Sequence, residues 1–395
     1  VPKGINSRLF SWKKYGTSKV GFYLRFVPEI FDFPESYPAS PWIHQAASGH
    51  IPHAQLIISQ NGGLAWPAVQ RYVQSLVCHN GGCGTCDGCI QHRQLAHPDV
   101  HYIFPVVASA SGSGTSDSFL GEFRNFLKFN KFPVVRNWIE ALDGSQKVVQ
   151  ISVKEAKRMG DLLSLTSHSG GYKFLVIWLP ERLHESAANK LLKTLEEPEP
   201  KTIILLISHQ EDGILGTIRS RCQTLYLPPW GRTEVERWLI DERKIDPNQA
   251  KILSALSGGE PGVALDFLEN RERLLPLAEH FVEWLRLAFK KDLPGLQQWV
   301  DQLGAWNREQ QRDFLVFSGG VLSQLERKRH QALRGFSLDW FPEVSFNAEG
   351  FSKLMDRQKV SLMHKTLDDA FKDVGRNVNA RLVFFDASLQ LMKAF

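Results

Sequence analysis

The sequence lacks any run of 18 or more apolar residues, the length that an α-helix needs to cross a membrane. It also lacks an apolar segment of the secretory type near its start, which predicts a cytoplasmic protein without a membrane partner. Methionine is scarce, with four in 395 residues, and the first residue is Val1. Acidic residues are missing from residues 1–26, where basic and aromatic residues alternate irregularly.

The acid-free segment belongs to an N-terminal extension, residues 1–44, whose role the sequence leaves open. A basic and aromatic arm is typical of nucleic-acid contact, and an acid-poor basic segment also fits a targeting sequence. No helical period runs through it, so a mis-assigned start or a disordered extension is the favoured interpretation.

The rest of the composition is that of an ordinary globular protein. Hydrophobic residues make up 43% and charged residues 23% of the chain, and the net charge is only +5. This charge permits contact with nucleic acid without requiring it. The length predicts two or three domains.

Cysteine is also scarce, but four of the five cysteines lie within twelve residues. Their spacing is Cys-x4-Cys-x2-Cys-x2-Cys, at Cys78, Cys83, Cys86 and Cys89. Four thiolates complete a tetrahedral Zn²⁺ shell and leave no open position, so we predict a structural zinc site in a module spanning residues 78–89. An iron–sulfur cluster is the main alternative.

Two histidines near this motif and the fifth cysteine are not predicted to bind the metal. His79 and His92 are interpreted as exposed bystanders rather than ligands. Cys222 is interpreted as a packed thiol or a motif residue.

Residues 45–228 alternate between apolar strands and helices. Continuous apolar strands alternating with helices predict a parallel sheet covered on both faces, the α/β class. The predicted strands are 55–59, 101–106, 148–152, 173–178 and 202–207. The predicted helices are 66–78, 119–138, 153–166 and 185–196. Residues 108–147 are interpreted as an insert.

After Pro228 and Pro229 the pattern is helical only. We predict a small helical lid domain over residues 229–271 and a separate helical bundle over residues 272–395. The expected bundle helices are 276–290, 295–303, 307–326, 350–373 and 377–394.

The loop after the first strand is where a nucleotide-binding α/β domain holds phosphate. That loop needs the pattern G-x-x-x-x-G-K-[ST], because the glycine amides cradle the phosphates and the lysine reaches the outer ones. Residues 59–67 read SQNGGLAWP, so Gly62 and Gly63 remain but the lysine and the hydroxyl are missing. Trp66 and Pro67 add bulk where the helix should begin.

A second part of the ATP chemistry is also missing. The apolar strand 173–178 should be followed by an acidic pair that holds Mg²⁺ and activates water. The chain has Trp178 and Leu179 there, which do neither. Two independent losses in the same machinery predict that the chain does not hydrolyse ATP.

Several motifs together carry a family resemblance. Residues 188–198 read ANKLLKTLEEP and residues 220–222 read SRC, accompanied by IPHA at 51–54 and HPD at 97–99. With the cysteine cluster, this pattern closely resembles the AAA+ clamp-loader subunits of bacterial DNA polymerase III. The resemblance implies an AAA+ (P-loop NTPase-like) domain, a helical lid and an all-α collar domain.

The resemblance also implies a role for the SRC motif. Its arginine, Arg221 here, projects into the ATP site of a neighbouring subunit in this family, with Ser220 beside it. A planar guanidinium suits stabilisation of γ-phosphate charge in trans. Arg219 is a nearby competitor for this role.

The departures from the family pattern indicate which type of clamp-loader subunit the chain resembles. The GEPG sequence at 259–262 is followed by Val263, where nucleotide-sensing members often carry arginine. A silent subunit that keeps SRC resembles the delta-prime type. The insert at 108–147 and the sequence RNVNA at 376–380 resemble the Bacteroidetes-type proteins.

The resemblance therefore implies a subunit that braces the ring and lends Arg221 to a neighbour. Its implied partners are gamma/tau-type and delta-type subunits, and through the complex the sliding clamp and primed DNA. The alternatives are an active gamma/tau-type ATPase subunit and a free-standing zinc-containing DNA-binding protein. The first needs a working phosphate loop, and the second needs tight, salt-sensitive DNA binding by the chain alone.

Overall fold

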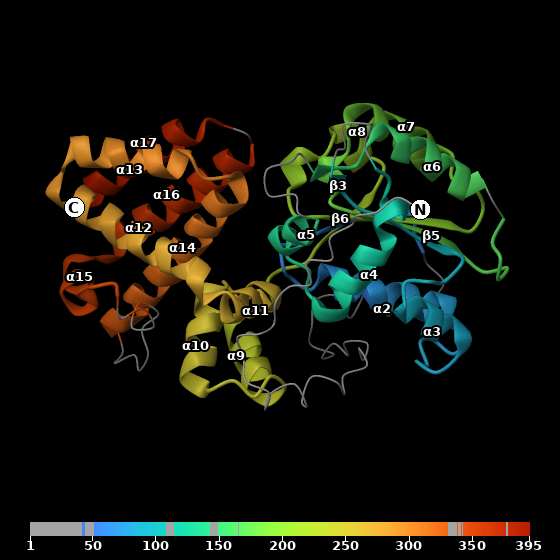
Figure 1. Ribbon diagram of the computed structural model, residues 1–395, viewed down its shortest axis with the longest axis horizontal. Coiled ribbons are helices and arrows are strands. Elements are labelled where there is room, and N and C mark those ends of the chain that lie inside the picture. Colours follow the sequence, from blue (N-terminus) through green and yellow to red (C-terminus); the bar gives the residue numbers. More distant parts are fainter. Residues whose placement is uncertain are drawn as a thin grey trace, which may run out of the picture.

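A computed structural model describes residues 42–43, 51–107, 114–142, 149–164, 166–330, 338, 341, 343–376 and 378–395. Most of the N-terminal extension, parts of the 108–147 insert and Asn377 therefore lie outside the described residues. In Figure 1 the sheet and the helices that cover it lie on the right, and a helical bundle lies on the left. The helices α9 (Arg232–Asp241), α10 (Pro247–Leu256) and α11 (Pro261–Glu269) connect these two parts.

The α/β part is built on a five-stranded parallel sheet in the order β2-β5-β6-β1-β7. Its strands are β1 (Ala54–Ile58), β2 (Val100–Ile103), β5 (Lys173–Trp178), β6 (Thr202–Ser208) and β7 (Gln223–Tyr226). The register places Leu56 opposite Leu206 on one side and Thr224 on the other. This arrangement confirms the expected α/β class.

Continuous apolar strands form because both faces of the sheet are covered. Every residue of β5 and β6 is buried. Alternate residues enter two separate apolar clusters: Val176 faces the cluster that includes α2 (Ala65–Val77), and Ile177 faces the cluster of α6 (Val153–Ser164) and α7 (Glu185–Glu196). The period of two along each strand thus divides one apolar run between two cores.

The expected single helix over residues 119–138 was wrong. The chain forms a short 3₁₀ turn η2 (Ser116–Phe119), then α4 (Leu120–Phe129) and α5 (Val135–Ala141). Pro133 lies in the gap between α4 and α5, and its missing N–H and fixed φ oppose a continuous helix there.

Strand assignments in the same region also changed. The expected strand 148–152 shortens to β4 (Val149–Gln150), which pairs antiparallel with β3 (Val106–Val107) outside the parallel sheet. The edge strand β7 and the helix α3 (Asp87–Arg93) were not anticipated.

Helices alone follow β7. The first three are α9 (Arg232–Asp241), α10 (Pro247–Leu256) and α11 (Pro261–Glu269). The bundle comprises α12 (Arg271–Lys290), α13 (Leu293–Gly304), α14 (Arg308–His330), α15 (Ala348–Leu354), α16 (Arg357–Gly375) and α17 (Ala380–Ala394). Within the described ranges no helix is long and apolar enough to cross a membrane.

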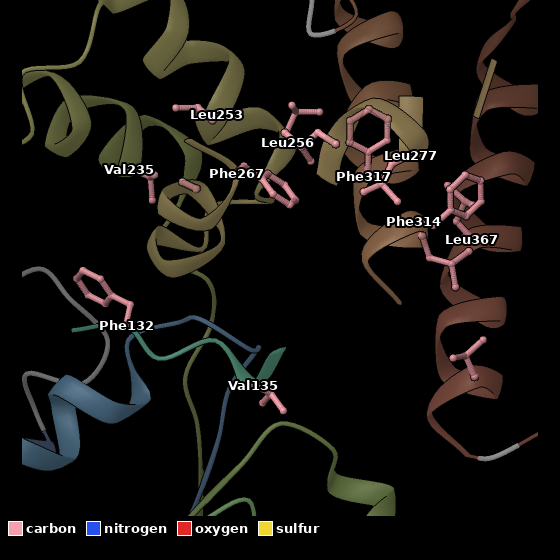
Figure 2. Close-up of a cluster of buried hydrophobic side chains, with 14 of the residues drawn as sticks. Phe132, Val135, Val235, Leu253, Leu256, Phe267, Leu277, Phe314, Phe317 and Leu367 are labelled. Carbon is pink, nitrogen blue, oxygen red and sulfur yellow. The ribbon is translucent and has the colours of Figure 1, made fainter. Parts of the chain in front are cut away.

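One apolar cluster runs through the three groups of elements. Figure 2 follows it from Phe132 of the α/β part, through Leu256 and Phe267 of the small helices, to Phe314 and Phe317 of the bundle. Because these side chains share one core, rotation of the small helices relative to either neighbour exposes apolar surface.

Ion pairs add a direct connection between the α/β part and the bundle. Arg182 contacts Glu309 of α14 at 2.7 Å, and Arg136 of α5 contacts Asp313 of the same helix. Burial raises the pKa of Asp313 to about 7 even though Arg136 opposes that shift. The bundle therefore contacts the α/β part without relying on the small helices alone.

Candidate functional site

Four cysteines from two helices and the loop between them converge at one point. Cys78 ends α2, Cys83 lies in the loop, and Cys86 and Cys89 lie at the start and in the middle of α3. Their four Sγ atoms all lie within 4.8 Å of one another. The structure thus brings together all four residues of the predicted ligand set.

The spacing of the sulfurs fits a tetrahedral metal. Ligands at about 2.3 Å from a tetrahedral Zn²⁺ lie about 3.8 Å apart, and the Sγ atom of Cys78 lies 3.5 Å from that of Cys83 and 3.7 Å from that of Cys86. Backbone N–H groups of Thr85 and Cys86 lower the pKa of Cys83 to about 6. For this one cysteine the thiolate that a metal requires is favoured before a metal binds, whereas the neighbouring thiols raise the pKa of Cys86 to about 12.

The loop that carries Cys83 needs glycine at three positions. Gly81, Gly82 and Gly84 have φ values of +65°, +104° and +79°, in the region that other residues rarely adopt. Arg71 donates to the carbonyl oxygen of Gly82 at 3.2 Å and so ties the loop to α2. This bracing fits a structural site, since all four positions around a metal are filled by the chain.

The two histidines near the motif differ. His79 is exposed, as expected, but His92 is buried, so its interpretation as an exposed residue was wrong. The His92 ring lies 2.9 Å from the carbonyl oxygen of Gln70, and burial lowers its pKa to about 4. His92 is a neutral packing residue and is not among the four residues that could hold the metal.

The degenerate phosphate loop is covered by its own chain. The amide of Gly262, in the first turn of α11, donates to the carbonyl oxygen of Gly62 at 2.8 Å. A Cβ at Gly62 would lie 3.0 Å from the amide nitrogen of Val263. The start of α11 therefore sits directly against the loop that would hold phosphate.

The second glycine of the loop faces an acidic side chain. A Cβ at Gly63 would lie 2.5 Å from Oε2 of Glu260, whose residue is 3% exposed. Burial raises the pKa of Glu260 to about 8, and its Oε1 atom has no hydrogen-bond partner in the described part of the chain. A carboxyl group thus occupies the approach to the loop where an active domain admits the phosphate anion.

The bulky residues of the two lost motifs meet in one aromatic cluster. The ring centroids of Trp66 and Trp178 lie 6.2 Å apart, and Trp66 meets Phe123 of α4 edge-on at 5.5 Å. Phe123 and Phe126 both pack near Trp178, at 5.7 and 6.4 Å. The aromatic face of the insert therefore covers the positions where an active domain holds Mg²⁺ and water.

The SRC motif, unlike the buried aromatic cluster, includes an exposed side chain. It follows the short helix α8 (Gly216–Arg219), and its three side chains have different surroundings. Cys222 packs against the sheet core, where burial raises its pKa to about 11. The Oγ atom of Ser220 donates to the carbonyl oxygen of Thr217 at 3.1 Å and closes the turn.

The side chain of Arg221 points outward and is 35% exposed. Its Nη1 atom donates to the carbonyl oxygen of Thr217 at 2.9 Å, and its Nη2 atom donates to Glu196 at the end of α7. The competitor Arg219 instead pairs with Glu211 at 3.1 Å. Sequence reasoning missed Glu196, although it lies in the quoted LEEP stretch.

Strand direction separates Arg221 from the phosphate loop of its own chain. Arg221 precedes β7, whereas the loop follows β1, and these strands are parallel neighbours. The two features therefore lie at opposite ends of the sheet, about 17 Å apart for a five-residue strand. Arg221 therefore does not reach the phosphate loop of its own chain.

Comparison with known proteins finds similarity to DNA polymerase III subunits. The family described as "DNA polymerase III, delta subunit" matches residues 38–230. The DNA polymerase III subunit delta' of Haemophilus influenzae is 24% identical over 372 residues, covering 89% of this chain and 96% of that protein. The subunit delta' of Escherichia coli is 26% identical over 304 residues, covering 75% of each chain.

The sheet order, the helical lid on the loop after β1 and the all-helical C-terminal part define an AAA+ protein of the clamp-loader class. Its altered phosphate loop separates it from members of that class that keep the G-x-x-x-x-G-K-[ST] pattern, whereas the SRC motif is one that it keeps. The family match over residues 38–230 and the similarity to delta' subunits along most of the chain support a delta-prime clamp-loader subunit. The Bacteroidetes-type resemblance of its insert stays a prediction.

Proposed function

We propose that this accessory subunit of DNA polymerase III performs no ATP hydrolysis of its own and supplies Arg221 as a trans-acting arginine finger to a gamma-type neighbour in the clamp loader. The observation that carries the proposal is the contrast between a phosphate loop covered by α11 and an arginine exposed at the opposite end of the sheet. In this role the chain helps to load the sliding clamp onto primed DNA.

The absence of ATP chemistry is supported by what fills the pocket. Trp178 is completely buried at the position of the first acidic residue, and Leu179 is 1% exposed at the second. Neither side chain binds Mg²⁺, and the neutral Glu260 occupies the approach to Gly63. Restoring hydrolysis would require rebuilding a packed core as well as a motif.

The finger role is supported by chemistry and position. A guanidinium carries a permanent charge and five N–H donors, and it suits the oxygens of a transferring phosphoryl group. Cys222 anchors the segment in the core, so Arg221 projects from a fixed base.

The test is Arg221→Ala in a clamp loader reconstituted from the partner subunits of the same organism. We expect ATPase activity stimulated by clamp and primed DNA to fall by about 10-fold or more, because arginine fingers contribute large factors to phosphoryl transfer. Arg219→Ala is the matched control, since it removes a neighbouring arginine and should keep most of the activity. Equal activity of Arg221→Ala and the wild type would end the trans-finger proposal.

We further propose that Cys78, Cys83, Cys86 and Cys89 hold a structural Zn²⁺. The tetrahedral spacing of the sulfurs supports this assignment. Metal analysis of purified protein should give one zinc per chain, and Cys89→Ser should lower that content and the melting temperature. Iron in place of zinc, with visible absorbance, would favour the iron–sulfur alternative.

A further inference from the structure

The guanidinium of Arg221 is already engaged within its own chain. The Nη2 atom donates to Oε1 of Glu196, and Nη1 is held by the carbonyl oxygen of Thr217. The fork that would meet phosphate therefore has a carboxylate as its partner in the free subunit. Carboxylate and phosphate oxygens present similar geometry to a guanidinium, so they compete for the same N–H groups.

The position of Glu196 in its helix favours a cation beside it. Glu196 is the last residue of α7, where the carbonyl ends of the helix disfavour a negative charge. A cation beside it relieves that repulsion, and α8, which leads to Arg221, packs against α7. Figure 1 shows the two helices side by side on the same edge of the α/β part.

The exposure of both partners sets the strength of the contact. The side chains of Arg221 and Glu196 are 35% and 49% exposed, so water and salt weaken their attraction. A γ-phosphate enclosed in a neighbour's pocket carries more charge and is less screened. The contact is therefore strong enough to orient the free arginine and weak enough for phosphate to displace it.

We propose that Glu196 is a positioning residue that acts as a latch: it holds Arg221 on its own subunit until the γ-phosphate of a neighbour's ATP takes the guanidinium from it. The latch rests on the proposed trans-finger function. It makes engagement of the finger depend on the bound nucleotide, because ADP offers no γ-phosphate to compete with the carboxylate.

The latch predicts a particular kinetic change. Removing the charge of Glu196 removes a competitor of the ATP-bound state and leaves the contacts of the transition state in place. A change that strengthens ground-state and transition-state binding equally lowers KM and leaves kcat unchanged. A weak, exposed pair limits the expected fall in KM for ATP to about 2- to 5-fold.

The experiment compares Glu196→Gln with Glu197→Gln in the reconstituted clamp loader, at saturating clamp and primed DNA. Glu197 is the adjacent exposed glutamate and is not among the hydrogen-bond or ion-pair partners of Arg221 in the described part of the chain, so its variant controls for loss of one negative charge. We expect KM for ATP to fall in Glu196→Gln alone, with kcat unchanged. Glu196→Asp, which keeps the charge, should return KM toward the wild-type value.

Three results would overturn the latch: an unchanged KM in Glu196→Gln, the same shift in Glu197→Gln, or a lower kcat in Glu196→Gln. The last would mean that Glu196 holds Arg221 in its productive orientation. Arg221→Ala in the same assay separates the two proposals. If it leaves hydrolysis unchanged, the finger role fails; if it abolishes hydrolysis while Glu196→Gln matches the wild type, only the latch fails.

Discussion

The two ends of the parallel sheet differ in how far the residues at the motif positions are buried. At the carboxyl ends of β1 and β5, Trp66 and Trp178 are buried in a shared aromatic cluster, and α11 closes over Gly62. At the amino end of β7, Arg221 is held only by exposed contacts. On the proposed function, side chains of the core replace the ATP chemistry, whereas the proposed arginine finger lies at the surface.

If the proposed loss of ATP chemistry is correct, this difference explains why it would be hard to reverse. A motif that had merely decayed would leave a cavity or a disordered loop at its position. Here the substituted side chains pack against one another and against α4 of the insert, so they contribute to stability. A return to ATP chemistry would have to lose that packing first.

The largest expected effect on stability is in the buried aromatic cluster at the carboxyl ends of the strands. Trp178→Ala removes a completely buried ring that lies against Trp66 and Phe123, and should lower the free energy of unfolding by about 3–5 kcal/mol. Denaturant unfolding followed by circular dichroism measures this change. Trp230→Ala, at a partly exposed tryptophan, is the control and should cost less; equal losses would mean that the cluster has no special packing.

An intermediate effect is expected at Glu260. Its pKa is about 8 in the folded protein and about 4.5 in the unfolded chain, so the folded state holds the extra proton between these values. Stability should therefore fall as pH rises from about 4.5 to about 8. Glu260→Gln stays neutral throughout, and above pH 8 it should be more stable than the wild type by about 1–3 kcal/mol.

Thermal melting at a series of pH values tests this effect of Glu260. Glu199→Gln, at an exposed loop position, is the control and should keep the wild-type profile. Asp313 also has a raised pKa, so part of the pH dependence should persist in Glu260→Gln. An unchanged profile in Glu260→Gln would show that this carboxyl is solvated and that the loop is not closed.

The smallest effect on stability is expected at Arg221, on the surface at the amino end of β7. Arg221→Ala removes a contact between partly exposed groups and should change the free energy of unfolding by no more than about 1 kcal/mol. The same variant is expected to lose most of the ATPase activity of the complex. A large loss of stability would instead make Arg221 a structural residue and weaken the comparison.

Much of the architecture could be predicted from the sequence. The apolar stretches 173–178 and 202–207 are long enough and continuous enough to identify buried strands, and the structure confirms both. The spacing of the four cysteines in the sequence is enough to predict that their side chains lie close together, and the structure confirms this. The short edge strand β7 carries no such signal, because Gln223 and Tyr226 are exposed and the two residues between them are only partly buried.

Features that depend on tertiary contacts could not be predicted from the sequence. The break between α4 and α5 follows from Pro133, but the amphipathic pattern on either side suggested one helix. His92 has an ordinary polar identity, and only the fold shows that Gln70 and Tyr102 enclose it. Glu196 and Glu260 lie in recognised motifs, yet their partners are 25 and 197 residues away in the chain.

The most direct test of the account is equilibrium binding of ATP to the isolated chain in the presence of Mg²⁺. The closed loop, the buried Glu260 and the aromatic cluster predict no saturable binding at millimolar ATP, with or without Mg²⁺. Saturable binding that a bulky substitution at Gly62 abolishes, while the protein keeps its melting temperature, would contradict the claim that the pocket is filled by its own chain.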